Sequence, residues 1–134
     1  MSPLIIEPGD SSPKVVLDPT NNIFELSGES HFENTSKFYI PILTWLDQYQ
    51  SALHQEKDKS RQEDLRMFEF KLNYFNSTSA KFIMDILMRL DKIAGDGWNV
   101  KARWYYDKRD EDMKESGEGF SMLLKKLPIE FIGF

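Results

Sequence analysis

The pattern of apolar and polar residues divides the first half of the chain into a hairpin and a long helix. Two β-prone runs, at 14–17 and 23–27, flank a turn-forming segment at 18–22. From Ser36 to about Glu56 the apolar residues recur at steps of three and four, which predicts a helix with one buried face. Pro41 lies early in this segment, so the helix is expected to start after residue 36 or to bend.

The second half alternates strands with helices. The aromatic-rich run 67–75 alternates imperfectly but is typical of a central strand. A continuous apolar stripe over 80–96 predicts a helix that stops at the glycine-rich turn 95–97. A strand at 98–106, a helix over parts of 110–126 with two interrupting glycines, and a short strand at 129–134 complete the chain.

The predicted order is β-β-α-β-α-β-α-β, which indicates a single α/β domain. Such an alternation favours a mixed β-sheet with parallel crossovers and with helices packed on it. Residues 1–13 are rich in Pro, Gly and Ser and are expected to form a flexible arm, so the predicted domain spans 14–134. Function is expected in the loops at the carboxyl ends of the strands.

Composition narrows the classes of function. The chain has 134 residues with 40% hydrophobic and 29% charged content, which suits one domain with a real core. The net charge of −5 disfavours nucleic-acid binding and favours a protein partner. No apolar run approaches the roughly 18 residues of a membrane span, and no signal peptide is evident. The absence of cysteine excludes thiolate chemistry and suits a cytoplasmic location.

A hydroxyl-rich run, Asn76-Ser77-Thr78-Ser79, lies between the strand at 67–75 and the helix at 80–96. Side chains of these types accept hydrogen bonds from the unpaired first N–H groups of a helix, so the run is a natural N-cap. The same position also favours negative charge, because the N–H groups and the helix dipole are positive there. A phosphate on one of these hydroxyls would be stabilised, and a simple cap and a modification site both remain open.

Signs of catalysis are few. His31 and His54 are the only histidines and lie far apart in the sequence, so no histidine-based metal site is predicted. No glycine-rich phosphate-binding fingerprint is complete. An acidic cluster at 107–112 has the oxygen ligands of a hard-cation site, but its spacing differs from an EF-hand loop and suits a solvated helix start. A small metal-dependent enzyme using this cluster is the rival hypothesis, and a constitutive scaffold, in which the hydroxyl run is only a cap, is another.

Two separated segments resemble the SiaC-like family of biofilm-regulating phosphoproteins. The first is Tyr-Phe-Asn-Ser-Thr-Ser-Ala-Lys at 74–81, followed by the apolar helix with Met-Asp-Ile-Leu at 84–87. The second begins with Trp-Tyr-Tyr-Asp at 104–107 and continues through the acidic residues 110–113 and Glu-Ser-Gly-Glu-Gly-Phe at 115–120 to 127–131. The resemblance covers the chain from about residue 14 onward. It implies a fold similar to the sulfate-transporter and anti-sigma-factor-antagonist domain, and a partner switch that is not an enzyme.

The resemblance also implies a phosphorylation cycle. In the family, a serine/threonine kinase phosphorylates a hydroxyl of the central motif, a metal-dependent serine/threonine phosphatase removes the phosphate, and the unmodified form binds and activates a diguanylate cyclase. The phosphorylated threonine, which directly follows the Asn, falls on Ser77. Here the sequence has Ser-Thr where the family commonly has Thr-Ser. The similar anti-sigma-factor antagonists carry their phosphoserine one step later, which favours Thr78, so Ser77 is the first expected site and Thr78 the second.

The expected partner surface surrounds these hydroxyls. A phosphate adds about −1.5 to −2 charge, and Lys81, roughly one helical turn on, is the expected counter-charge. A partner that fits neutral hydroxyls would have to desolvate this dianion, so we expect binding to be lost while the fold is kept. No cofactor, metal, nucleic acid or membrane is expected to bind. Besides the two phosphorylation sites, the residues expected to contact a partner are Tyr74, Asn76, Ser79, Lys81, Tyr105 and Tyr106.

Overall fold

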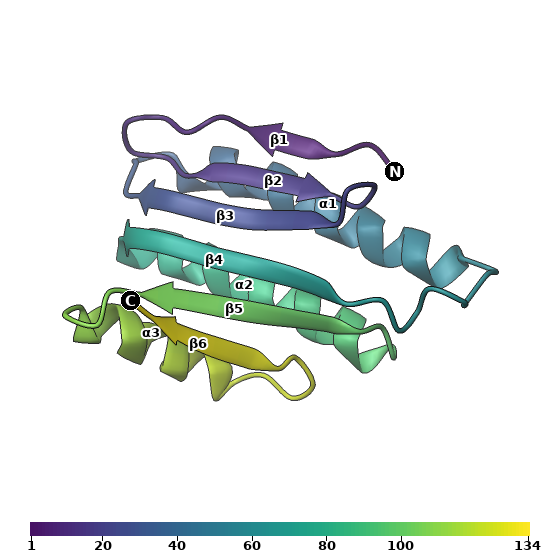
Figure 1. Cartoon of the computed structure of the whole chain (residues 1–134). Helices are drawn as coiled ribbons and strands as arrows, with labels where there is room; N and C mark the ends of the chain where they lie inside the picture. Colours follow the sequence, from purple (N-terminus) through teal and green to yellow (C-terminus); the bar gives the residue numbers. More distant parts are fainter.

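The computed structural model describes residues 1–134 and contains a six-stranded sheet and three helices (Figure 1). The strands lie side by side in the order of the sequence. The neighbours from β1 to β3 are antiparallel and those from β3 to β6 are parallel, with one helix in each parallel connection. The elements are β1 (Leu4–Ile6), β2 (Lys14–Asp18), β3 (Ile23–Ser30), α1 (Thr35–Gln55), β4 (Arg66–Phe75), α2 (Ser77–Gly95), β5 (Val100–Tyr106), α3 (Glu111–Ser121) and β6 (Ile129–Gly133).

The mixed α/β sheet and the order of elements from β2 onward are confirmed, but the structure adds a strand before them. β1 pairs with β2 in an antiparallel register that places Ile5 opposite Val16. The carbonyl of Ser2 also accepts a hydrogen bond from Trp45 Nε1 at 3.0 Å. The expected flexible arm is therefore tied to the sheet and to α1. A strand of three residues is too short to show an alternation, whereas the Pro-rich and Gly-rich composition of residues 1–13 predicts a flexible arm.

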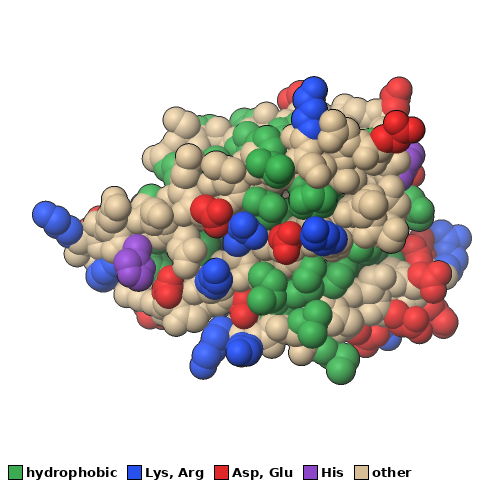
Figure 2. Space-filling model, turned by 180° about the vertical axis from the view of Figure 1, so that it is seen from behind, with side chains coloured by type: hydrophobic (Ala, Val, Ile, Leu, Met, Phe, Trp, Pro, Cys, Tyr) green, Lys and Arg blue, Asp and Glu red, His purple; other side chains and the backbone are tan.

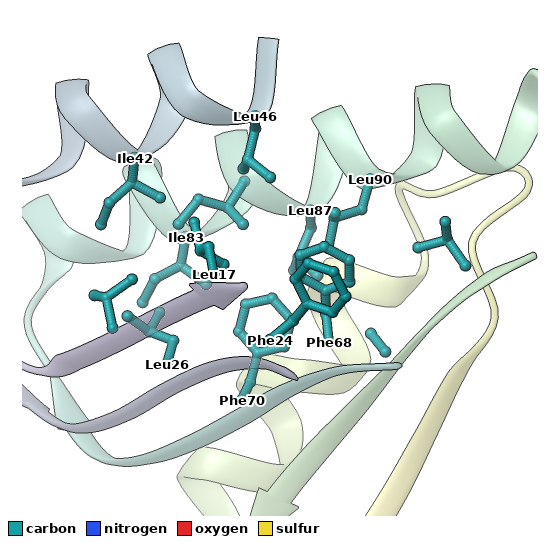
Figure 3. Close-up of a cluster of buried hydrophobic side chains, with 14 of the residues drawn as sticks. Leu17, Phe24, Leu26, Ile42, Leu46, Phe68, Phe70, Ile83, Leu87 and Leu90 are labelled. Carbon is teal, nitrogen blue, oxygen red and sulfur yellow. The ribbon is translucent and has the colours of Figure 1, made fainter. Parts of the chain in front are cut away.

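All three helices cover one face of the sheet, seen behind the strands in Figure 1. Each crossover moves one strand further in the same direction, so connections of one hand place every helix on the same side. The core fills the space between these layers, where Phe24 stacks on Phe68 with ring centroids 4.2 Å apart. Its other members include Leu17, Leu26 and Phe70 from the strands and Ile42, Leu46, Ile83, Leu87 and Leu90 from the helices (Figure 3).

The opposite face of the sheet carries a row of alternating charges. Glu25, Glu69, Arg103 and Glu130 occupy one register across β3 to β6. The Nζ atom of Lys71 lies 3.5 Å from a carboxylate oxygen of both Glu25 and Glu69. Arg103 bridges Glu69 and Glu130 with two contacts of 3.4 Å. Cross-strand ion pairs of this kind suit a sheet face that meets water, so this face requires no second layer of helices.

A β-bulge explains the imperfect alternation of β4. Leu72 and Tyr74 pair with consecutive residues of β3, which leaves Asn73 as an extra residue. The bulge resets the period of two, so Phe75 reaches the core side again and contacts Trp104, with ring centroids 6.1 Å apart. Tyr74 consequently points away from the core and is 52% exposed.

Helix α1 begins at Thr35 and runs through Pro41 without interruption. Its N-cap is Asn34, whose side chain accepts a hydrogen bond from the amide of Lys37 at 3.3 Å. Pro41 is exposed, so water can hydrate the carbonyl that its missing N–H leaves unpaired. The apolar period from Ser36 thus places the start within one residue, whereas the later start expected from Pro41 is wrong. None of the helices has the length and apolar character of a membrane span.

Candidate functional site

The hydroxyl run lies at the carboxyl edge of the sheet, where β4 ends and α2 begins. Asn76 is the N-cap of α2, and its Oδ1 accepts a hydrogen bond from the amide of Ser79 at 3.0 Å. The helix starts at Ser77, three residues before the apolar stripe indicates. The hydroxyls of Ser77, Thr78 and Ser79 therefore lie within the first helical turn, and the cap is an amide side chain.

Ser79 is fully buried and belongs to a hydroxyl network beneath the turn. Its Oγ donates to the carbonyl of Ser30 at 3.0 Å and accepts from Ser30 Oγ at 2.8 Å. The hydroxyl of Tyr39 lies 2.6 Å from Ser30 Oγ and must donate to it, since the Ser30 proton is already used. Burial raises the pKa of the Tyr39 phenol, which keeps this proton in place. The expectation that Ser79 contacts a partner is thus corrected, because its side chain is inside the protein.

Ser30 and Tyr39 are site residues that the sequence does not reveal. Ser30 ends β3 and Tyr39 lies in the second turn of α1, far from the hydroxyl run along the chain. They meet Ser79 because β3 and β4 are parallel neighbours, with Ser30 opposite Phe75, so both strands end at the same edge. No local motif marks either residue.

Ser77 and Thr78 are both exposed, but their hydroxyls are not equivalent. Thr78 Oγ1 donates to Asn76 Oδ1 at 3.0 Å and is therefore part of the cap. The hydroxyl of Ser77 makes no hydrogen bond within the chain. A phosphate on Thr78 would remove a donor from the capping oxygen and place negative charge beside it. A phosphate on Ser77 would instead meet the unpaired N–H groups of the first turn.

The surroundings of Ser77 are suited to negative charge. The first turn of α2 contains no acidic residue. Lys81 follows Ser77 by four positions and so lies on the same side of the helix. It is exposed, and its Nζ atom lies 5.9 Å from the centroid of the Phe82 ring. Lys81 is therefore an exposed cation one helical turn after Ser77.

The structure separates the three tyrosines that were expected on the partner surface. Tyr74 lies at the end of β4, two residues before the cap, with its ring edge-on to His31 at 5.8 Å between centroids. Tyr105 is on the sheet face opposite the helices and donates to Glu69 Oε1 at 2.9 Å. Tyr106 is half-buried against the core on the helix side. Alternation along β5 thus places Tyr105 across the sheet from α2.

Two carboxylates of the acidic cluster after β5, those of Asp107 and Asp110, have structural partners. Arg109 donates to both oxygens of Asp107 at 3.1 and 2.8 Å, and its hydrogen bonds lower the pKa of Asp107 to about 2. Asp110 is the N-cap of α3 and accepts a backbone N–H at 3.1 Å. Glu111 and Asp112 follow in the first turn, where the helix dipole stabilises acidic side chains. No three His, Asp or Glu side chains lie close enough together to hold a metal ion.

Ser79→Ala is expected to lower the free energy of unfolding by about 1–3 kcal/mol, because it leaves the buried hydroxyl of Ser30 without its acceptor. The carbonyl of Ser30 loses one donor and keeps the amide of Asn76 at 3.0 Å. Ser77→Ala, two residues earlier, should change this free energy by less than about 0.5 kcal/mol, since its hydroxyl is free. Urea denaturation followed by circular dichroism measures both. Similar small changes in the two variants would contradict the structural role of Ser79.

Helices on one face of a mixed six-stranded sheet, with exposed hydroxyls in the first turn of a capped helix, define a small single-domain α/β protein. Over residues 6–134 the chain matches the family described as SiaC family regulatory phosphoprotein. It is also 30% identical over 120 residues to an uncharacterised protein of Pseudomonas aeruginosa strain UCBPP-PA14. This alignment covers 90% of this chain and 88% of the relative. The chain belongs to the SiaC family of regulatory phosphoproteins.

Solved structures confirm the fold. Apo-SiaC of Pseudomonas aeruginosa superposes with a TM-score of 0.82 at 25% identity, over 98% of this chain and 99% of that one. A second SiaC structure from this organism gives a TM-score of 0.81 at 25% identity, over 100% of both chains. The crystal structure of the diguanylate cyclase SiaD in complex with its activator SiaC contains a chain that matches with a TM-score of 0.82 at 24% identity, over 98% of this chain and 99% of that one.

Proposed function

We propose that this protein is a non-enzymatic activator of a diguanylate cyclase and that phosphorylation of Ser77 switches it off. The observation that carries the switch is an exposed, unbonded hydroxyl at the start of α2 in a member of a phosphoprotein family. The choice of partner rests on the similarity to SiaC, which is described as the activator of the diguanylate cyclase SiaD. The unmodified form is the one that binds.

The phosphate changes the surface and leaves the fold intact. It adds about −1.5 to −2 charge and three acceptor oxygens at the positive end of α2. The cap is untouched, since Asn76 Oδ1 keeps its bonds to Ser79 and Thr78. The buried hydroxyl network beneath the turn also stays closed, because Ser77 takes no part in it. The added charge therefore acts on the binding of the partner.

A serine/threonine kinase adds this phosphate and a metal-dependent serine/threonine phosphatase removes it. Both enzymes require a side chain that reaches solvent, the kinase to modify its hydroxyl and the phosphatase to remove the phosphate, which Ser77 and Thr78 provide and Ser79 does not. Thr78 is the second acceptor, and its use would cost the hydrogen bond that it donates to Asn76. Ser77 is therefore the preferred position.

Ser77→Ala is expected to abolish phosphate incorporation by the cognate kinase, and Thr78→Ala is expected to leave most of it. Intact-protein mass spectrometry after incubation with kinase and ATP counts the phosphates on each variant. Incorporation lost in Thr78→Ala but kept in Ser77→Ala would move the site by one residue. Incorporation that is undiminished in the double variant would contradict the proposal.

A further inference from the structure

An aromatic cluster lies directly behind the hydroxyl run, between the first halves of α1 and α2. The ring of Tyr39 stacks on Phe82, with centroids 5.3 Å apart and an interplanar angle of 3°, and on Phe32 at 6.4 Å. Phe38 packs edge-on against Tyr39 at 5.0 Å. Tyr39 is fully buried and shares the hydroxyl network of the turn, whereas the three phenylalanines are only half-buried. Parts of these three rings therefore reach the surface beside the proposed phosphorylation site.

The apolar surface continues along α1. Ile40 is 54% exposed, and Pro41, which follows it, is exposed as well. A hollow of about 400 Å³ lies beside the cluster and is lined in part by Phe32, Phe38 and Lys37. Figure 2 shows hydrophobic side chains reaching the surface of the helix layer, interspersed with basic and acidic side chains. We refer to Phe38, Ile40 and Phe82, with Lys37 and Lys81, as the α1/α2 surface.

The charge on the α1/α2 surface is positive, although the chain has a net charge of −5. Lys37 and Lys81 are both exposed, and neither takes part in an ion pair. The sequence contains no acidic residue from 34 to 46 or from 74 to 84, and Glu33, Asp47 and Asp85 are the acids that directly border these stretches. The two helices also direct their positive N-terminal ends to this edge of the sheet.

We infer that the α1/α2 surface binds a segment of the cyclase that carries apolar side chains flanked by Asp or Glu. The identity of this partner rests on the proposed function. Apolar side chains would pack on Phe38, Ile40 and Phe82, as anchors do at the centre of an interface. Carboxylates at the rim would pair with Lys37 and Lys81, which steer an acidic segment to this surface and disfavour a basic one.

This surface gives the phosphate a competitive role. Lys81 lies on the same side of α2 as Ser77, so a phosphate on Ser77 takes up positive charge that a partner carboxylate would otherwise use. The phosphate also repels that carboxylate. The switch then requires no rearrangement of the aromatic cluster or of the hydroxyl network.

The test uses a purified diguanylate cyclase of the source organism that the wild-type protein activates. Isothermal titration calorimetry measures the affinity of each surface variant for this cyclase. Lys37→Glu, Lys81→Glu and Ile40→Ser are each expected to weaken binding about tenfold, and the double lysine variant about a hundredfold. Matched controls are Lys101→Glu, on the opposite face of the sheet, and Ile23→Ser, at a position that is 49% exposed. Both controls should stay within about twofold of the wild type.

Two further readouts identify the occupant. The wild-type affinity should fall as NaCl is raised, and that of the double lysine variant should fall less, because fewer charge pairs are screened. A photoreactive side chain at position 40 should crosslink to an acidic and apolar segment of the cyclase. Crosslinking to a basic segment, or to a second copy of this chain, would overturn the inference.

The outcomes also distinguish this inference from the proposed function. Wild-type affinity in the lysine variants, or equal losses in the controls, overturns the α1/α2 surface and leaves the cyclase proposal standing. If the wild type binds and activates no diguanylate cyclase, both fail. Thermal denaturation of each variant ensures that a lost affinity does not come from a lost fold.

Discussion

Phosphorylation of Ser77 is expected to weaken cyclase binding at least a hundredfold and to abolish activation. A partner that covers the start of α2 must strip water from a phosphate dianion, and an uncompensated buried charge costs several kcal/mol. About 2.8 kcal/mol is enough for a hundredfold loss of affinity. The measurement titrates a purified diguanylate cyclase of the source organism with the unmodified and the fully phosphorylated protein and follows the formation of cyclic di-GMP.

Two controls define this prediction. Ser77→Ala should bind and activate as the unmodified protein does, since the hydroxyl itself has no structural role. Circular dichroism and thermal denaturation should be the same for both phosphorylation states, because the cap at Asn76 and the buried network at Ser79 do not involve Ser77. A scaffold in which the hydroxyl run is only a cap would activate equally in both states, and that result would contradict the switch.

Gly117→Ala is expected to lower the free energy of unfolding by about 1–3 kcal/mol, and Gly117→Val by more, because the site is already full. A Cβ atom at Gly117 would lie 2.5 Å from both Cδ1 and Nε1 of Trp104. Trp104 cannot easily move aside, since it is 1% exposed and its Nε1 donates to the carbonyl of Met113 at 2.9 Å. Urea denaturation measures the loss.

Gly119→Ala is the matched control for this packing. Gly119 lies in the same helix two residues later, and a Cβ atom there would have no neighbour within 4 Å. The free energy of unfolding of this variant should rise by about 0.5–1 kcal/mol, since alanine has a higher helix propensity than glycine. Equal effects of the two substitutions would contradict the close contact between Gly117 and Trp104. The sequence presents both glycines only as interruptions of a helix, and the tertiary contact distinguishes them.

The strands and helices from residue 14 onward were predictable because each is long enough to show its period. The errors fall where a local pattern is short or is reset. β1 has only three residues, and the bulge at Asn73 shifts the alternation of β4 by one position. The apolar stripe predicts a start of α2 three residues after Ser77, because the first turn carries hydroxyls and no apolar residue to extend the stripe.

The sequence by itself determined the class of the sheet, the family and the position of the hydroxyl-rich turn, because these depend on local periodicity, capping chemistry and motifs. The family resemblance ranked Ser77 before Thr78 for phosphorylation and left Ser79 as an expected partner contact. Only the tertiary structure shows that Ser79 is inside the protein, since the parallel pairing of β3 with β4 brings Ser30, and the packing of α1 brings Tyr39, against it. That contact removes Ser79 from solvent, and the hydrogen bond from Thr78 Oγ1 to Asn76 Oδ1 leaves Ser77 as the free hydroxyl at the positive end of α2. The sequence does not show the burial of Ser79, because which face of a helical turn is buried depends on contacts distant in sequence.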